Sequence, residues 1–300
     1  RRLGKIDTGQ LIDLCNDDIE KKIINRLQAL QKEDFAKYKE FFKNYGINLK
    51  FGAYENYGSK KELLQDLLIY TTKGLSEVTT RLREEGTDDM ISLKTYVENM
   101  KEGQKDIYFA SGKTKDEVLA MPQMDIIKKY GYDVLILTDD VDEFLFKIIN
   151  KYQEHEFKSV NQATLDDLST EEEKAKINEQ KETNKDLLEA MKEALKDEVK
   201  DVVLSTRLVD SPVCLVSGDG ISFEMEKYFN SVQPDANMKA QRVLELNLSH
   251  PAVKKMEEFI KSDVDRAKKY AEVLYSQALL IAGLPLENPS EYTDLVCSIM

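Results

Sequence analysis

The sequence is poor in the residues that bind metals and form disulfides. Its three cysteines, Cys15, Cys214 and Cys297, lie far apart and show none of the paired spacings of a zinc site. The two histidines, His155 and His250, are equally isolated. Reduced thiols in a cytoplasmic protein explain this pattern best, so we expect no structural metal site.

Long apolar runs are also missing. No stretch approaches the roughly twenty apolar residues that a membrane span needs. The chain opens on Arg1-Arg2-Leu3-Gly4, with neither an initiator methionine nor the apolar segment of a signal peptide. We therefore expect a cytoplasmic protein whose chain has been cut from a longer one.

Positive charge is in deficit, because 43 lysines and arginines face 56 aspartates and glutamates, a formal net charge of −13. Phosphate binding needs clustered lysine and arginine, so this balance argues against a nucleic-acid partner. A well-solvated surface explains it better than a specific basic partner does. With 41% hydrophobic and 33% charged residues over 300 positions, the chain can form two domains with real cores and a helix-rich surface.

Helical periodicity dominates the first part of the chain, where residues 17–45 predict two helices. The first has one apolar face, formed by Ile19, Ile23, Leu27 and Leu30. The second has an aromatic stripe that we interpret as core and expect to end at Gly46; it consists of Phe35, Tyr38, Phe41, Phe42 and Tyr45. A third helix is expected over residues 60–70, with four buried leucines, Leu63, Leu64, Leu67 and Leu68.

Strands and helices alternate over residues 92–152. Residues 107–110 and 134–137 are short apolar runs typical of buried strands, and the helical segment 115–130 between them is broken by Pro122. Asp140 and Glu143 have the spacing of a capping box, which predicts the start of another helix. This order predicts an α/β domain with a parallel βαβ sheet and flanking helices.

Periodicity fades after residue 153, and we expect a first domain over residues 1–160, a linker over 161–180 and a second domain over 181–300. The second domain begins with a helix that buries Leu187, Leu188, Met191 and Leu195. Strands are expected at residues 202–204 and 213–216, joined across Asp210-Ser211-Pro212, and at 243–246. This part is therefore predicted to be an α+β domain that ends in a helical hairpin.

The last forty residues carry a pattern typical of helix pairing. Six residues follow a heptad spacing, and the face of a final helix, capped by Asn288 and Pro289, follows them. Pattern alone leaves two interpretations open: both helices complete their own core, or they pair with a second chain. The residues concerned are Val264, Ala267, Ala271, Leu274, Ala278 and Ile281, then Tyr292, Leu295, Val296 and Ile299.

Two other segments could bind partners. The helix over residues 221–232 has a methionine and aromatic face, Ile221, Met225, Tyr228 and Phe229, between two polar stretches that suggest a loose tether. Phe144 lies beside Glu143 at the start of another helix. Core packing is the stronger interpretation of both on sequence grounds.

Signals of catalysis are weak. Ser217-Gly218-Asp219-Gly220 is a turn, since no phosphate-binding loop motif surrounds it. Four carboxylates that follow a strand could hold Mg²⁺, although helix capping explains two of them. They are Asp139, Asp140, Asp142 and Glu143.

The string Ser92-Leu93-Lys94-Thr95-Tyr96-Val97-Glu98-Asn99-Met100, continuing through Gln104 to Ile107-Tyr108, resembles the middle domain of the heat-shock protein 90 chaperones, in the style of the bacterial high-temperature protein G type. Further similar stretches follow in the family's order from about Ile19 to Met300, and they include residues 134–144 and 274–282. The chain is thereby identified as a member of this family.

The resemblance implies a stress-response chaperone fragment, with a middle domain and a dimerising C-terminal domain, whose ATPase domain is absent. ATP and Mg²⁺ would then belong to the parent protein and not to this fragment. The partners implied are a second copy and non-native or near-native client proteins, with no nucleic acid and no membrane. Client-binding positions of the family fall on Glu143, Phe144, Lys147, Ile221, Met225, Tyr228 and Phe229.

The resemblance also bears on three details. Phe144 and Tyr228 depart from the family's residues but keep their apolar character. A family arginine that reaches the ATP phosphate falls near Arg2, although Leu3-Gly4 follow it in place of the family's next residues. The ending Ile299-Met300, without an acidic tail, favours a bacterial-type cytoplasmic member.

Two other functions stay open from the residues themselves. One is a phosphoryl-transfer or hydrolytic enzyme that uses the carboxylates near Asp139. The other is a plain dimerisation scaffold, which would pair but not protect an unfolding protein.

Overall fold

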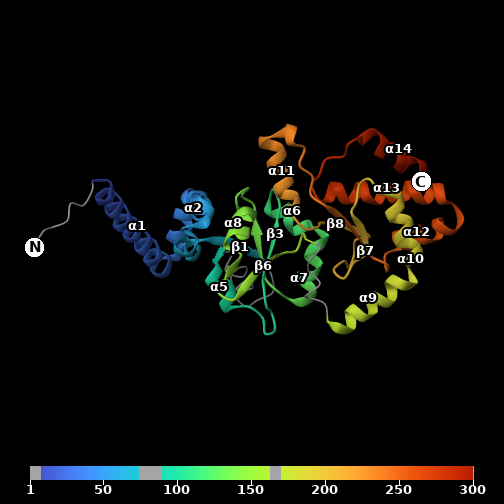
Figure 1. The fold of residues 1–300 in the computed structure, drawn as a ribbon. Coiled ribbons are helices and arrows are strands. Elements are labelled where there is room, and N and C mark those ends of the chain that lie inside the picture. Colours follow the sequence, from blue (N-terminus) through green and yellow to red (C-terminus); the bar gives the residue numbers. More distant parts are fainter. Residues whose placement is uncertain (1–7, 74–89, 163–169, 300) are drawn as a thin grey trace, which may run out of the picture.

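The computed structural model describes residues 8–73, 90–162 and 170–299, and the chain forms an elongated molecule (Figure 1). Helix α1 projects from one end, a six-stranded sheet lies in the middle, and a three-stranded sheet with the last helices forms the other end. Among the described helices, none is both long enough and apolar enough to cross a membrane.

The first part of the chain is helical as expected, but its second helix runs further. It contains α1 (Thr8–Glu33), α2 (Phe35–Gly58), α3 (Lys61–Leu64) and the 3-10 turn η1 (Gln65–Leu67). The expected stop at Gly46 is wrong. A Cβ at Gly46 would lie 2.6 Å from the Phe42 ring, so the glycine allows that ring to pack against the helix backbone. On α1 it is Ile24 that is buried, while Ile19 and Ile23 are exposed.

The helix expected over residues 60–70 is only partly present. It is short, Leu63 is exposed, and the chain enters a strand at Ile69. Residues Leu67 to Tyr70 form a continuous buried run, which periodicity alone cannot assign to helix or strand.

The middle sheet has the strand order β2-β1-β4-β3-β6-β5. Its strands are β1 (Ile69–Lys73), β2 (Met90–Ser92), β3 (Ile107–Ser111), β4 (Val134–Leu137), β5 (Lys151–Tyr152) and β6 (His155–Ser159). Strand β3 is parallel to both β4 and β6, with Phe109 opposite Leu135, and β1 is antiparallel to β4. The parallel unit is confirmed, whereas β6, in a stretch expected to lack order, has only one buried residue to mark it.

Helices cover this sheet, and Pro122 breaks the segment between β3 and β4 as expected. They are α5 (Leu93–Glu98), α6 (Lys115–Ala120), the 3-10 turn η2 (Pro122–Met124), α7 (Asp125–Tyr130) and α8 (Asp142–Ile149). The capping box expected at the start of α8 is wrong. Val141 occupies the cap without a side-chain bond, and the Asp142 carboxylate instead accepts a hydrogen bond from the Asp139 amide at 3.1 Å.

The remainder of the chain contains a three-stranded sheet and helices, and it ends in three consecutive helices. Its strands are β7 (Asp201–Leu204), β8 (Val213–Ser217) and β9 (Arg242–Leu246), and β9 lies between the other two. Strands β7 and β8 follow each other along the chain across Asp210-Ser211-Pro212, as expected, and each of them pairs with β9. Its helices are α9 (Glu171–Thr183), α10 (Lys185–Ala194), α11 (Phe223–Val232), the 3-10 turn η4 (Pro234–Ala236), α12 (Pro251–Ser262), α13 (Val264–Ile281) and α14 (Pro289–Ile299).

The stretch expected to be a linker is partly regular. Helix α9 begins at Glu171, and the Thr170 and Glu173 side chains form a complete capping box there. Glu173 also accepts hydrogen bonds from Lys129 at 2.6 Å and from Tyr130 at 3.0 Å, both on α7. These contacts attach α9 to the first domain, and the domain boundaries stay a prediction.

A buried lysine joins α2 to the residues that follow strand β4 of the middle sheet. The Lys50 ammonium lies 2.7 Å from Asp139 Oδ2 and 2.7 Å from Asp142 Oδ1, with the Tyr70 ring centroid 4.8 Å away. The contact to Asp142 is an ion pair without hydrogen-bond geometry. Burial raises the pKa of the Asp142 carboxyl, and the ammonium opposes that rise.

Removing the Lys50 charge should destabilise the fold strongly. We expect Lys50→Met to lower the free energy of unfolding by about 3–5 kcal/mol, because Asp142 would keep its burial without its cation. Urea unfolding followed by circular dichroism measures this. Lys94→Met is the control: Lys94 pairs with Glu98 at 3.7 Å on the surface, and its loss should change stability by less than about 0.5 kcal/mol. Equal effects of the two variants would contradict the role given to Lys50.

Candidate functional site

Two segments that are far apart in the sequence meet through their aromatic side chains. The Phe144 ring on α8 lies 5.4 Å from the Tyr228 ring and 5.5 Å from the Phe229 ring, both on α11. On its other side, the Tyr54 ring of α2 lies 6.3 Å away. All of these contacts are edge-to-face, the arrangement that aromatic pairs favour.

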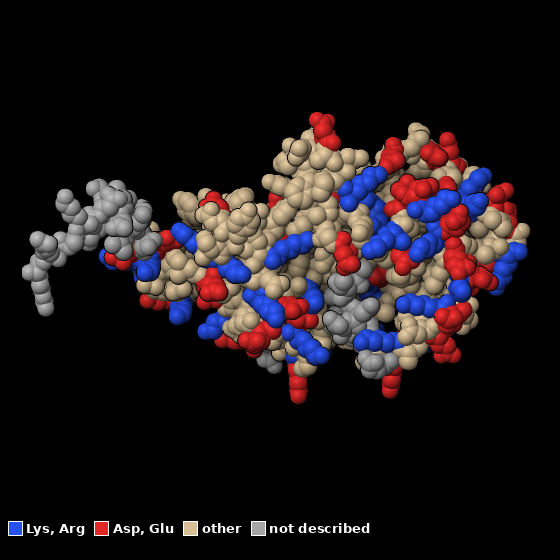
Figure 2. All heavy atoms as spheres, in the orientation of Figure 1, with Lys and Arg blue, Asp and Glu red and all other residues tan. Residues whose placement is uncertain are grey.

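These rings border an open depression of about 160 Å³, the aromatic groove. Phe51 is 47% exposed at its edge, and Asp140 is the charged residue among its lining side chains. In Figure 2, the surface over α11 is largely free of charged side chains, unlike the helices at the carboxyl-terminal end. The lining residues are Phe51, Tyr54, Asp140, Val141, Phe144, Tyr228 and Phe229.

Helix α11 is anchored and not loosely tethered. Ser222 caps it by accepting a hydrogen bond from the Met225 amide at 3.1 Å. The buried Glu226 carboxylate accepts hydrogen bonds from the Ala240 amide at 2.6 Å and from Arg242 at 2.8 Å. Lys147 on α8 donates to the Gly220 carbonyl, which ties the turn before α11 to α8.

Some candidate residues of this region are exposed at the groove, and others are buried beneath the surface. Phe144, Tyr228 and Phe229 are partly exposed and lie together. Met225 is only 2% exposed, so it cannot form part of the surface in this conformation. Ile221 packs against the core of the second domain.

Sequence reasoning missed Phe51 and Tyr54, which form one wall of the groove. Both lie beyond Gly46, where the helix was expected to end. A signal was present, because Ile47, Phe51 and Tyr54 recur at spacings of four and three and so share a helical face.

A second candidate surface lies on α13 and α14. Four residues of the expected heptad seam are not available to a partner, because their own domain buries them in its core; they are Ala267, Ala271, Leu274 and Ala278. Val264 and Ile281 are 61% and 45% exposed at the two ends of α13. None of the described residues of α14 is fully buried, and its apolar face is half-exposed: Tyr292, Leu295, Val296 and Ile299.

The carboxylates after β4 do not form a metal site. Lys50 places its ammonium between Asp139 and Asp142, where a cation would have to bind. Over residues 8–73, 90–162 and 170–299, no three histidine, cysteine or acidic side chains are grouped so that they could hold a metal ion. The turn Ser217 to Gly220 connects β8 to α11 and does not have the length of a phosphate-binding loop.

Comparison with known proteins assigns the family. A profile of the Hsp90 protein family matches residues 5–300. The chain belongs to the Hsp90 family. It is 39% identical over 289 residues to the chaperone protein HtpG of Clostridium botulinum strain Langeland, 38% identical over 289 residues to that of Bacillus subtilis, and 40% identical over 282 residues to that of Clostridium acetobutylicum.

This Hsp90-family chain spans less than half the length of these relatives. The matches cover 96%, 96% and 94% of the chain, but only 44%, 44% and 43% of the relatives. The resemblance inferred from the sequence is thus confirmed. Arg2, the residue that falls near the family's phosphate-binding arginine, lies outside the described residues.

Glu143, the neighbour of Phe144 on α8, is a buried carboxylate of this Hsp90-family chain. It is 7% exposed, and burial raises the pKa of its carboxyl above the ordinary 4.5. Glu224 adds to that rise, while Lys147 and the Ser222 hydroxyl oppose it. The Ser111 hydroxyl lies close and also opposes the rise, but it makes no hydrogen bond of normal geometry.

Glu143→Gln should stabilise the protein at high pH. At about pH 8 the carboxyl is ionised in the unfolded chain, and burial in the fold disfavours that charge, whereas the amide is neutral in both states. As the pH falls through the raised folded-state pKa and then the ordinary value, both states become protonated and the difference should shrink. Thermal unfolding at a series of pH values between about 8 and 4 measures it. A constant offset at every pH would mean that the carboxyl ionises normally in the fold.

Proposed function

We propose that this chain is the client-binding and dimerising part of a cytoplasmic Hsp90-type stress chaperone. The relatives are named chaperones, and because the chain covers 44% of the length of the first of them, the activity of the whole protein is itself part of the proposal. The observation that carries it is the aromatic groove, in which two family client positions, Phe144 on α8 and Phe229 on α11, lie 5.5 Å apart. A groove with exposed rings and a single charged lining residue suits apolar side chains of many sequences.

One groove alone would bind weakly. Burying one large apolar side chain contributes about 1.5–3 kcal/mol, which is less than the roughly 4 kcal/mol of a millimolar complex. Two grooves carried by a dimer would raise the effective affinity without any new kind of contact. Weak, repeated contacts suit a protein that must bind and release different clients.

The second copy is proposed to pack on the exposed apolar residues of α13 and α14. Val264, Ile281, Val296 and Ile299 carry this role, because the alanines and Leu274 of the heptad seam belong to the core of their own domain. A symmetric pairing of two such helical hairpins forms a four-helix arrangement.

In this proposal the chain performs no chemistry of its own. ATP and Mg²⁺ would act in a part of the relatives that the chain does not cover, and the bound client would respond to them through the domain contacts. An enzyme centred on Asp139 is not proposed, because the Lys50 ammonium pairs with both that carboxylate and Asp142.

Charging the groove should weaken client binding. We expect Phe229→Glu to weaken the binding of a permanently unfolded protein, reduced and carboxymethylated α-lactalbumin, about tenfold, which corresponds to about 1.4 kcal/mol. Fluorescence anisotropy of the labelled client measures the dissociation constant. Tyr57→Glu is the matched control. Tyr57 is also aromatic and is 98% exposed, but it lies outside the groove lining. Unchanged affinity of a folded Phe229→Glu variant would reject the groove as the client site.

Dimerisation should depend on the exposed face of α14 and not on the buried residues of the heptad seam. Wild-type chain is expected to sediment at about twice its 34.5 kDa mass, and Val296→Lys to sediment as a monomer with unchanged helix content. A lysine near the helix carboxyl end favours the folded helix, so its effect reports on the interface. Thr293→Lys, at an exposed position on the same helix, is the control. A Val296→Lys variant that still forms the dimer would place the interface elsewhere.

A further inference from the structure

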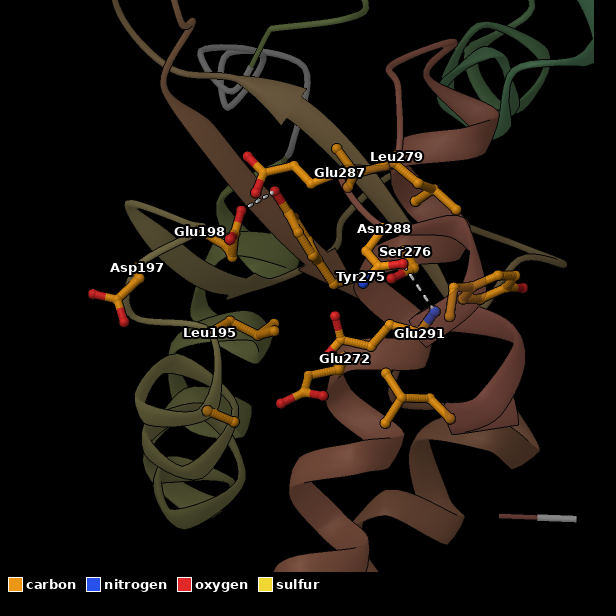
Figure 3. Close-up of a pocket in the computed structure, with 14 residues that line it drawn as sticks. Leu195, Asp197, Glu198, Glu272, Tyr275, Ser276, Leu279, Glu287, Asn288 and Glu291 are labelled. Carbon is orange, nitrogen blue, oxygen red and sulfur yellow. Dashed lines mark hydrogen bonds between the residues drawn. The ribbon is translucent and has the colours of Figure 1, made fainter. Parts of the chain in front are cut away.

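A larger groove lies at the carboxyl-terminal end of the molecule, between α10, α13 and α14 (Figure 3). Its volume is about 530 Å³, within the range of about 300–1,000 Å³ that ligand pockets occupy. We call it the acidic groove. It is distinct from the aromatic groove, with which it shares no lining residue.

The floor of the acidic groove is apolar and aromatic. Leu195 ends α10, Tyr275 and Leu279 come from α13, and Tyr292 and Leu295 come from α14. Tyr292 and Leu295 are half-exposed, so this floor has room for another apolar group. Val296 and Ile299, proposed above for the second copy, are not among the lining residues.

Carboxylates surround this floor, and none of the 14 described residues that line it is a lysine or an arginine. Two of the carboxylates have a partner of their own. Glu198 accepts a hydrogen bond from the Tyr275 hydroxyl at 3.2 Å, and Glu287 pairs with Lys239 at 3.1 Å. The carboxylates of the other three form no hydrogen bond or ion pair among the described residues, although Lys196 acts electrostatically on Asp197, and Lys268 and Lys269 act on Glu272. These three are Asp197, Glu272 and Glu291.

Glu272 and Glu291 come from different helices and lie side by side in Figure 3. Burial raises the pKa of the Glu272 carboxyl, and the charge of Glu291 raises it further, although Lys268 and Lys269 on α13 oppose the rise. Like charges held together around an apolar floor are stabilised by a cation that enters between them.

The spacing of these groups decides what kind of cation fits. No described cluster of acidic side chains is close enough to hold a metal ion, so the carboxylates suit a more extended ligand. Lysine and arginine place a charge at the end of an apolar stem, and tyrosine rings favour such cations. A free inorganic cation would leave the leucines and tyrosines of the floor without contact.

We infer that the acidic groove binds a basic amphipathic segment of a partner protein. One or two of its lysine or arginine side chains pair with Glu272, Glu291 and Asp197, and an adjacent apolar side chain packs on Tyr292 and Leu295. The net charge of −13 draws such a segment towards the chain. This is a second binding site, separate from the proposed client groove.

The test uses the full chain carrying Phe229→Ser, so that the aromatic groove contributes little. The probe is a fluorescein-labelled peptide, acetyl-Leu-Arg-Leu-Lys-Leu-Arg-amide, whose binding is followed by anisotropy at low and at physiological salt. We expect Glu272→Gln combined with Glu291→Gln to weaken binding about tenfold or more, and added salt to weaken wild-type binding. The control is Glu179→Gln with Glu182→Gln, which removes the same charge from exposed positions of α9.

Two further ligands test whether binding requires both the positive charge and the peptide that carries it. The same peptide with citrulline in place of both arginines, and norleucine in place of lysine, should bind about tenfold more weakly than the basic peptide, and spermidine should compete only weakly. Equal binding by the groove variant and its control would overturn the inference, as would spermidine that competes as well as the peptide.

The association state completes the test. Sedimentation of the Glu272→Gln, Glu291→Gln variant should match that of wild type. If the mass of this variant in solution instead differs from that of wild type, the groove belongs to the contact between two copies. The inference of a separate partner is then wrong.

Discussion

The ion pairs of Lys50 are the constraint on which the candidate site depends. A buried ammonium is costly unless carboxylates surround it, so α2 must lie beside Asp139 and Asp142, which follow the strand β4. This position brings the second half of α2 against α8, and with it Tyr54 against Phe144. One wall of the aromatic groove is therefore a consequence of an electrostatic requirement beneath it.

The other wall is positioned by contacts between the two sheets. Arg207, which follows β7, is buried and donates to the Val160 carbonyl at 2.7 Å and to the Gln162 carbonyl at 3.2 Å, both after β6. Its guanidinium also pairs with Glu245 of β9 at 2.8 Å. These bonds join the segment after β6 to the segment after β7, and the Lys147 bond to the Gly220 carbonyl joins α8 to the turn before α11. A client surface formed by both helices would consequently respond to any movement between the two parts.

Much of the fold could be predicted because its signals are local. The buried strands β3 and β4, the break at Pro122 and the terminal helices follow from short apolar runs and capping residues. The strand β6 could not, since parallel pairing with β3 stabilises it although its own residues are mainly half-buried. Gly46 was misinterpreted because a glycine that admits a packed ring and a glycine that ends a helix have the same local sequence signal.

The sequence by itself determined the family, most of the helices, the buried strands β3 and β4, and the residue types able to bind an apolar partner. Only the tertiary structure decided which of those residues reach the surface. Heptad spacing is satisfied equally by a partner helix and by neighbours within one domain, and here Ala271 and Ala278 pack within their own domain. Likewise, Met225 and Phe229 share a helix, yet one is buried and the other is half-exposed. Burial depends on contacts between residues far apart in the chain, and no local pattern contains them.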